Sequence, residues 1–106
     1  MTLDPEDSKI ITLARAARAR NGAREGAAVR DETGRTYSAT SVELSSLRLS
    51  AVQVAVAMAV SSGAQSLEAA ALVTEGEHAG EADEAVVREL GAKALFVAGP
   101  DGTLRG

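Results

Sequence analysis

The sequence has no cysteine, no tryptophan and a single histidine among its 106 residues. Without cysteine the chain can form no disulfide, and it has no thiolate to hold zinc or act as a nucleophile. Only Tyr37 and Phe96 are aromatic, so there is almost nothing on which nucleic-acid bases could stack. The formal net charge is −4, which gives no overall attraction for nucleic acid or acidic lipid. We therefore expect neither nucleic acid nor a membrane as a partner.

Long apolar runs are missing too. None approaches the roughly 18 residues that indicate a transmembrane helix. The N-terminal segment MTLDPEDSKI is acidic, unlike the basic and apolar start of a signal peptide. We expect a cytoplasmic protein. The length fits a single domain over residues 1–106, because no repeat, low-complexity tract or linker divides the chain.

Helix start and stop signals predict three helices. Asp4-Pro5 is a typical N-cap with proline at the first helical position, and Asn21-Gly22 ends that helix. We read the arginines between Arg15 and Arg24 as its solvated face. For the second helix, Ser45 or Ser46 offers an N-cap. The second and third helices are expected at Ser50–Val60 and Glu81–Leu90.

Strand signals separate these helices. The runs GAAVRD and RTYSATSV flank a glycine-containing turn and predict a hairpin. The apolar runs Leu67–Thr74 and Lys93–Ala98 predict buried strands, since they lack polar alternation. The order is α-β-β-α-β-α-β. It predicts an α/β protein, a three-layer α-β-α sandwich with helices on both faces of a mixed sheet.

The helix expected at Ser50–Val60 has no polar stripe. Apart from Ser50, its only polar side chain is Gln53. A helix that is apolar all round must be covered on all sides, and one sheet covers only one of them. We therefore expect a homo-oligomer, a dimer or tetramer, with this helix at or beside a symmetric interface.

Several segments together resemble the cytidine deaminase family, over most of the chain from about Glu6 to Leu104. They are Gly26-Ala27-Ala28-Val29, Thr33-Gly34, Ser41-Val42-Glu43, the run from Leu49 to Val56, and His78-Ala79-Gly80-Glu81-Ala82. The resemblance implies the cytidine deaminase-like fold. It also implies a zinc-bound hydroxide, a glutamate that moves protons, and assembly into dimers or tetramers.

The resemblance places the family's three zinc ligands on Ser50, Ala79 and Ala82, and its proton-shuttling glutamate on Val52. A serine hydroxyl is a poor zinc ligand at neutral pH, alanine has no donor atom, and valine cannot move a proton. We therefore expect no catalytic residue, no metal and no other cofactor. His78 stands among acidic residues, but these acids suit a helix start and show no fixed ligand spacing, so we do not expect a carboxylate–histidine metal site there.

The resemblance also concerns the substrate cleft. It places the family's ribose-binding asparagine on Ser41 and keeps its partner as Glu43, while the aromatic that packs on the pyrimidine falls on Ala23. Ser41 and Glu43 are therefore the candidate ligand-binding residues.

Three functions follow, in order of preference. The first is a catalytically inactive, cytidine deaminase-like protein that acts as an oligomeric structural or interaction module. The second is a module that binds a nucleoside or similar small molecule in the cleft, and the third is an active zinc-dependent deaminase. An open polar pocket between Ser41, Glu43, Ser50 and Ala79 favours binding, whereas a filled one favours a scaffold.

Overall fold

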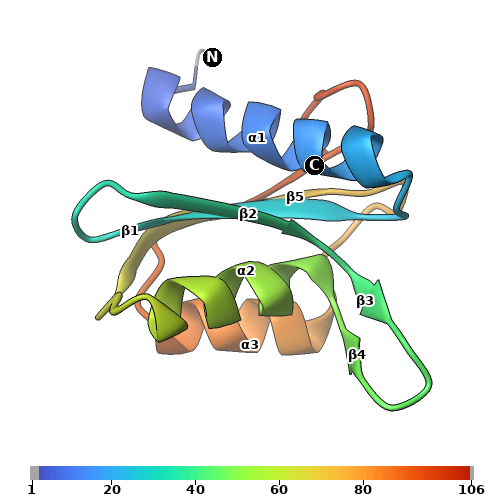
Figure 1. Ribbon diagram of the computed structural model, residues 1–106. Helices are drawn as coiled ribbons and strands as arrows, with labels where there is room; N and C mark the ends of the chain where they lie inside the picture. The colour runs from blue at the N-terminus through green and yellow to red at the C-terminus, as the bar shows by residue number, and fades with distance from the viewer. Residues whose placement is uncertain (1–2, 106) are drawn as a thin grey trace.

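The computed structural model describes residues 3–105, which form three layers (Figure 1). A four-stranded sheet lies in the middle, with one helix on one face and two helices on the other. In chain order the elements are α1 (Pro5–Asn21), β1 (Gly26–Asp31), β2 (Thr36–Thr40), β3 (Val42–Glu43), β4 (Arg48–Leu49), α2 (Ala51–Ser61), β5 (Leu67–Val73), α3 (Glu81–Glu89) and β6 (Leu95–Ala98). The α-β-α sandwich expected from the sequence is confirmed.

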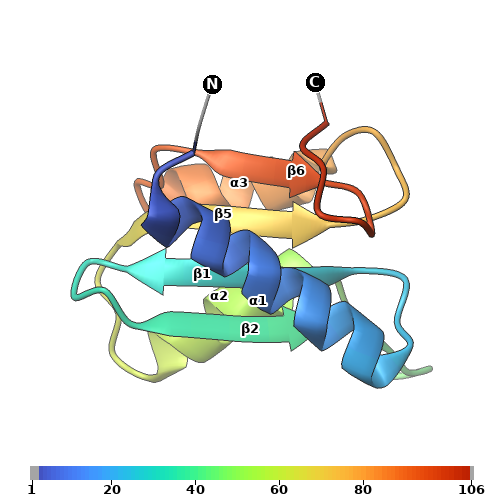
Figure 2. The ribbon, with the colours of Figure 1, turned by 90° about the horizontal axis from the view of Figure 1, so that it is seen from above.

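The central sheet is mixed, and its strand order is β2-β1-β5-β6. Strand β1 pairs antiparallel with both β2 and β5, whereas β5 and β6 are parallel and are connected through α3. Figure 2 shows this order, with α1 lying across the sheet. Because β1 is antiparallel to β2 and β5, its first residues lie at the same edge of the sheet as the last residues of those two strands. This edge carries the candidate site.

Helix α1 begins and ends as the sequence predicts. The Asp4 carboxylate accepts a hydrogen bond of 2.8 Å from the backbone N–H of Glu6, and Gly22 ends the helix at a φ of 60°. The helix packs tightly on β1 at Gly26, where a Cβ atom would lie 2.1 Å from the Ala14 carbonyl oxygen. Only glycine allows this close approach.

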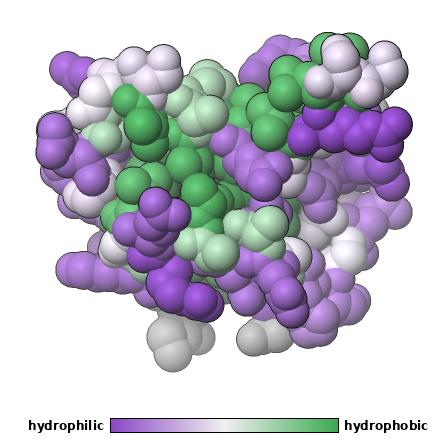
Figure 3. Space-filling model, turned by 90° about the horizontal axis from the view of Figure 1, so that it is seen from below, coloured by the Kyte–Doolittle hydropathy of each residue, from purple (hydrophilic) through white to green (hydrophobic). Residues whose placement is uncertain are grey.

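Helix α2 buries one side against the sheet and leaves the other uncovered. Its buried residues are Ala51, Val52, Ala55, Val56 and Ala59. Met58 is 41% exposed and Val60 is 48% exposed. Helix α3 lies beside α2, and α1 lies on the far face of the sheet. Figure 3 shows the α2–α3 side, with apolar side chains gathered in its middle and polar ones around them.

The segment between β2 and α2 differs from the expectation. We expected Ser45 or Ser46 to cap α2, but residues 42–49 form the short hairpin β3–β4, closed by a 2.9 Å bond from the Leu44 N–H to the Leu47 carbonyl. The cap is Ser50. Its hydroxyl accepts a bond from the Gln53 N–H, and the Gln53 side chain accepts one from the Ser50 N–H, so the two form a capping box.

The remaining boundaries shift by only one or two residues. Strand β6 begins at Leu95 rather than Lys93, and α3 ends at Glu89, with Leu90 as its C-cap. Such shifts are usual where helix and strand ends fray. Among residues 3–105, no helix combines the length and hydropathy needed to cross a membrane.

Candidate functional site

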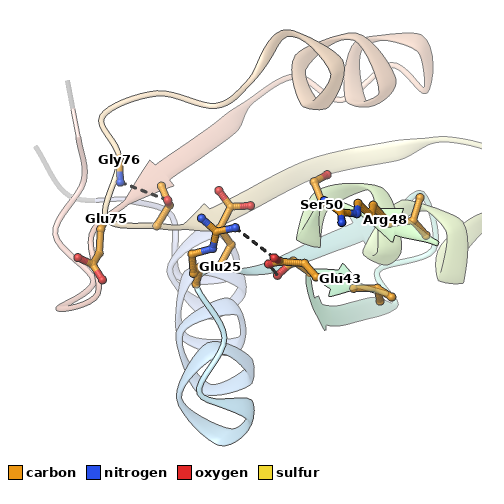
Figure 4. A pocket seen from close by; sticks show the side chains of 11 residues that line it. Glu25, Glu43, Arg48, Ser50, Glu75 and Gly76 are labelled. Carbon is orange, nitrogen blue, oxygen red and sulfur yellow. Dashed lines mark hydrogen bonds and ion pairs between the residues drawn. The ribbon is translucent and has the colours of Figure 1, made fainter. Parts of the chain in front are cut away.

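A pocket of about 640 Å³ opens at the edge of the sheet, beside the first turn of α2. Its walls come from four short segments, 24–25, 41–43, 48–50 and 74–76 (Figure 4). Each segment lies where one element passes into the next: α1 into β1, β2 into β3, β4 into α2, and β5 into the following loop. The sheet fixes these junctions at one edge, where α/β proteins commonly bind ligands.

The pocket brings together three residues that the sequence singled out: Ser41, Glu43 and Ser50. The Ser41 hydroxyl donates to the Glu43 carboxylate at 3.5 Å, and Arg24 forms a 3.1 Å ion pair with the same carboxylate. Both partners of this ion pair are largely exposed, so it adds little to stability. The carboxylate of Glu43 thus stays accessible at the mouth of the pocket.

Ser50 joins the pocket to the interior. Its hydroxyl donates a 2.5 Å hydrogen bond to the carboxylate of Asp83, which is only 6% exposed. The same hydroxyl oxygen accepts from the Gln53 N–H at 3.1 Å. Asp83 lies in the first turn of α3, where a negative charge is favoured by the helix dipole. One serine therefore connects the N-terminal turns of α2 and α3.

Glu25 is the partly buried carboxylate of the pocket. It lies between Glu75 on one side and Ser50 on the other (Figure 4). Burial raises the pKa of Glu25 above its ordinary value, and the negative charges of Asp83 and Glu43 raise it further. The Thr74 hydroxyl and the charge of Arg24 oppose this rise without cancelling it. None of the four ion pairs among residues 3–105 involves Glu25.

The other positions singled out by sequence lie outside the pocket. Val52 is fully buried in the core, Ala79 is half-buried against that core, and Ala82 is exposed on α3. The expectation that Ala79 borders the cleft was wrong, because the loop after β5 puts residues 74–76 there instead. His78 is exposed in this loop, and no three imidazole, thiolate or carboxylate groups of residues 3–105 are gathered so as to hold a metal.

Three lining or supporting residues were missed. Arg24 was read as part of a solvated helix face, but Gly22 ends the helix before it. Glu25 carried no local signal, because its environment arises from segments far away in the sequence. Asp83 was read only as an acid at a helix start. Asp83 follows Ala82, a position that the resemblance matched to a zinc ligand, and this was the one signal in the sequence that Asp83 lies near the site.

Solved structures share this architecture. A cytidine deaminase from Burkholderia pseudomallei is 28% identical, with a TM-score of 0.75 and coverage of 92% of this chain and 87% of that one. One from Mycobacterium tuberculosis is 26% identical, with a TM-score of 0.73 and coverage of 96% and 90%. One from Mycobacterium leprae, at 22% identity, a TM-score of 0.71 and coverage of 93% and 92%, shares the fold.

Among curated proteins, no sequence matches this chain significantly. The family model described as cytidine deaminase-like, however, matches residues 3–102, nearly the whole chain. This match agrees with the architecture that the chain shares with the solved structures. The chain belongs to the cytidine deaminase-like family.

Proposed function

We propose that this protein binds a small nucleoside-like molecule in the pocket and does not carry out zinc-dependent deamination. One observation carries the proposal. The pocket is open and polar at Ser41 and Glu43, while Ser50, Val52, Ala79 and Ala82 occupy the positions matched to the family's zinc ligands and proton-shuttling glutamate. An open polar pocket favours ligand binding, whereas a filled one would favour a purely structural role, so the open pocket supports binding.

The residues present do not fit a zinc ion. A catalytic zinc site needs three nitrogen, sulfur or carboxylate donors and one open position. The chain has no cysteine. Ala79 and Ala82 have only methyl groups, and the Ser50 hydroxyl already donates to Asp83. No part of the proposed function therefore depends on zinc.

The proton-transfer position also lacks a working group. Deamination requires a carboxylate or similar group that accepts and returns protons within hydrogen-bond reach of the substrate. The matched residue, Val52, is apolar and fully buried in the hydrophobic core. A binding function needs neither a metal nor a base at these positions. It needs only the polar groups at the mouth of the pocket.

Glu43 is the proposed anchor, with Ser41 beside it. A carboxylate accepts hydrogen bonds from two hydroxyl groups, which suits a ribose. Isothermal titration of cytidine and uridine tests this. We expect saturable binding that Glu43→Ala abolishes, whereas Glu77→Ala, outside the pocket, leaves it unchanged. The proposal is refuted if neither nucleoside binds at millimolar concentration, or if the protein carries one zinc per chain and releases ammonia from cytidine.

A second role, self-assembly, rests on a different observation. The outward side of α2 exposes Met58 and Val60, and the neighbouring hairpin exposes Leu44 and Leu47. We propose that a second copy of the chain covers α2 in a homodimer or tetramer, because apolar side chains gain roughly 1.5–3 kcal/mol each on full burial. Light scattering tests this, and a 10.8 kDa particle at high concentration contradicts it.

A further inference from the structure

The carboxylates that line the pocket differ in how they are neutralised. Glu43 pairs with Arg24 at 3.1 Å, and Glu75 pairs with Arg18 at 3.1 Å. Glu25, which lies between them, pairs with no cation of residues 3–105. Arg24 is paired with Glu43 and is largely exposed to water, and Arg48, which also lines the pocket, forms no ion pair with residues 3–105. One carboxylate is thus left without a counter-ion in the middle of the pocket.

The surroundings of Glu25 make this lack of a cation unfavourable. The side chain is partly buried, and the buried Asp83 is bonded to Ser50, which lines the same pocket. Among residues 3–105, Asp83 forms no ion pair and accepts a side-chain hydrogen bond from the neutral Ser50 hydroxyl alone, so only the start of α3 offsets its negative charge. Two carboxylates that lie close together in a partly desolvated environment repel each other, unless a nearby positive charge offsets them. Burial first, and then the negative charges of Asp83 and Glu43, raise the pKa of Glu25.

We propose that the pocket selects a small organic molecule with a positively charged nitrogen, an amine or an amidinium, and that this group binds Glu25. The proposal rests on the proposed function, because it specifies the ligand of the same pocket. A charged N–H donor would gain a strong, charge-assisted hydrogen bond to the carboxylate and would relieve its repulsion with Asp83. A phosphate bound at Glu25 would instead be repelled by its unpaired carboxylate. The volume of about 640 Å³ lies in the usual range for small-molecule sites.

Benzamidine and benzamide form a suitable pair of probes, since they have similar shapes and only benzamidine is charged at neutral pH. We expect isothermal titration at low salt to show that benzamidine binds at least about tenfold more tightly than benzamide. Glu25→Gln keeps the size of the side chain and removes its charge, so it should abolish the difference. Glu77→Gln, an exposed acid of the neighbouring loop outside the pocket, should preserve it. Thermal melts establish that each variant is folded.

Two results overturn the proposal: no preference for benzamidine in the unaltered protein, or a preference that survives Glu25→Gln. A preference lost equally in Glu77→Gln also overturns it, because the binding then reflects only the general negative charge. Titrating uridine into the same samples separates this inference from the proposed function. If uridine binds through Glu43 and benzamidine shows no preference, only the choice of a cationic ligand is wrong. If neither uridine nor benzamidine binds, both proposals fail.

Discussion

The hydroxyl of Ser50 donates a 2.5 Å hydrogen bond to the buried carboxylate of Asp83 while accepting one from the backbone N–H of Gln53. These two bonds join the first turns of α2 and α3 through Ser50 and Asp83, which are 33 residues apart in the sequence. The connection is made next to the pocket, so it fixes the wall that Ser50 contributes. A small hydroxyl and a carboxylate thereby hold two helix starts in place.

Removing the Ser50 hydroxyl should destabilise the protein. Ser50→Ala eliminates the N-cap of α2, an effect of about 0.5–2 kcal/mol. It also leaves Asp83 buried without its donor, which adds about 1–3 kcal/mol. Urea unfolding measures the change. Because both residues act through one bond, the double variant Ser50→Ala/Asp83→Ala should lose less stability than the sum of the two single variants.

Ser46→Ala is the matched control, because Ser46 is exposed on the β3–β4 hairpin and its side chain makes no hydrogen bond with residues 3–105. It should change the free energy of unfolding by no more than about 0.5 kcal/mol. Equal effects of Ser50→Ala and Ser46→Ala would show that the bond to Asp83 contributes nothing.

The two sides of α2 should respond differently to a new charge. Val56 is 5% exposed and packs in the core, so Val56→Glu should unfold the protein by burying an unpaired carboxylate. Met58 is 41% exposed, so Met58→Glu should leave the fold intact and weaken self-association. Circular dichroism reports the fold, and light scattering reports the assembly.

The exposed Ala16 on α1 provides the control for Met58→Glu, since Ala16→Glu adds the same charge on the opposite side of the molecule. It should change neither fold nor assembly. If both variants dissociate the oligomer equally, the charge acts through net repulsion, and the α2 surface is not the interface.

Asp31 should stabilise the hairpin in a pH-dependent way. Burial alone raises the pKa of Asp31, but bonds from the Thr33 N–H and hydroxyl, the Arg35 N–H and the Tyr37 hydroxyl outweigh burial and hold its pKa below the ordinary 3.8. The carboxylate therefore contributes stability above pH 3.8, and this contribution is lost as the pH falls through the lowered value.

Asp31→Asn should consequently destabilise the protein by about 1–3 kcal/mol at neutral pH. The gap from the unaltered protein should narrow as the pH falls below 3.8. Urea unfolding at a series of pH values measures both effects. A gap that stays constant down to the lowest pH would mean that the amide disturbs packing, and that the charge of Asp31 is unimportant.

The negative charge of Glu25 should have the opposite effect on stability to that of Asp31. Its pKa in the folded protein is raised above the ordinary 4.5 by burial first, and then by Asp83 and Glu43, against Thr74 and Arg24. Ionised Glu25 therefore weakens the folded state at pH values above its raised pKa, whereas below pH 4.5 the group is protonated in both states and has no effect.

Glu25→Gln should accordingly raise the free energy of unfolding at neutral pH, by up to about 1 kcal/mol because the group is partly solvated. This gain should disappear below pH 4.5. A variant that is more stable and yet has lost its preference for a cationic ligand would fit a residue kept for binding at some expense of stability. A neutral-pH loss of stability would contradict this account.

The sequence by itself determined the features that depend on near neighbours. The Asp4-Pro5 start and the Gly22 end of α1 follow from local hydrogen bonding and backbone freedom, which act within one helical turn. The apolar run of β5 indicated a strand that is covered on both faces, and the order of the main elements indicated the three-layer sandwich. The lack of cysteine likewise excludes thiolate metal ligands, whatever the fold.

Only the tertiary structure decided which side chains meet. Arg24 and Glu43 are 19 residues apart, and Ser50 and Asp83 are 33 apart. Each pair forms because the strand order brings several chain junctions to one edge of the sheet. The choice of Ser50 over Ser45 and Ser46 as the cap of α2 also depended on the β3–β4 hairpin, which uses residues 42–49. The physical reason is that charge pairing and burial depend on distances in space, whereas the start and end of a helix depend on residues close together along the chain.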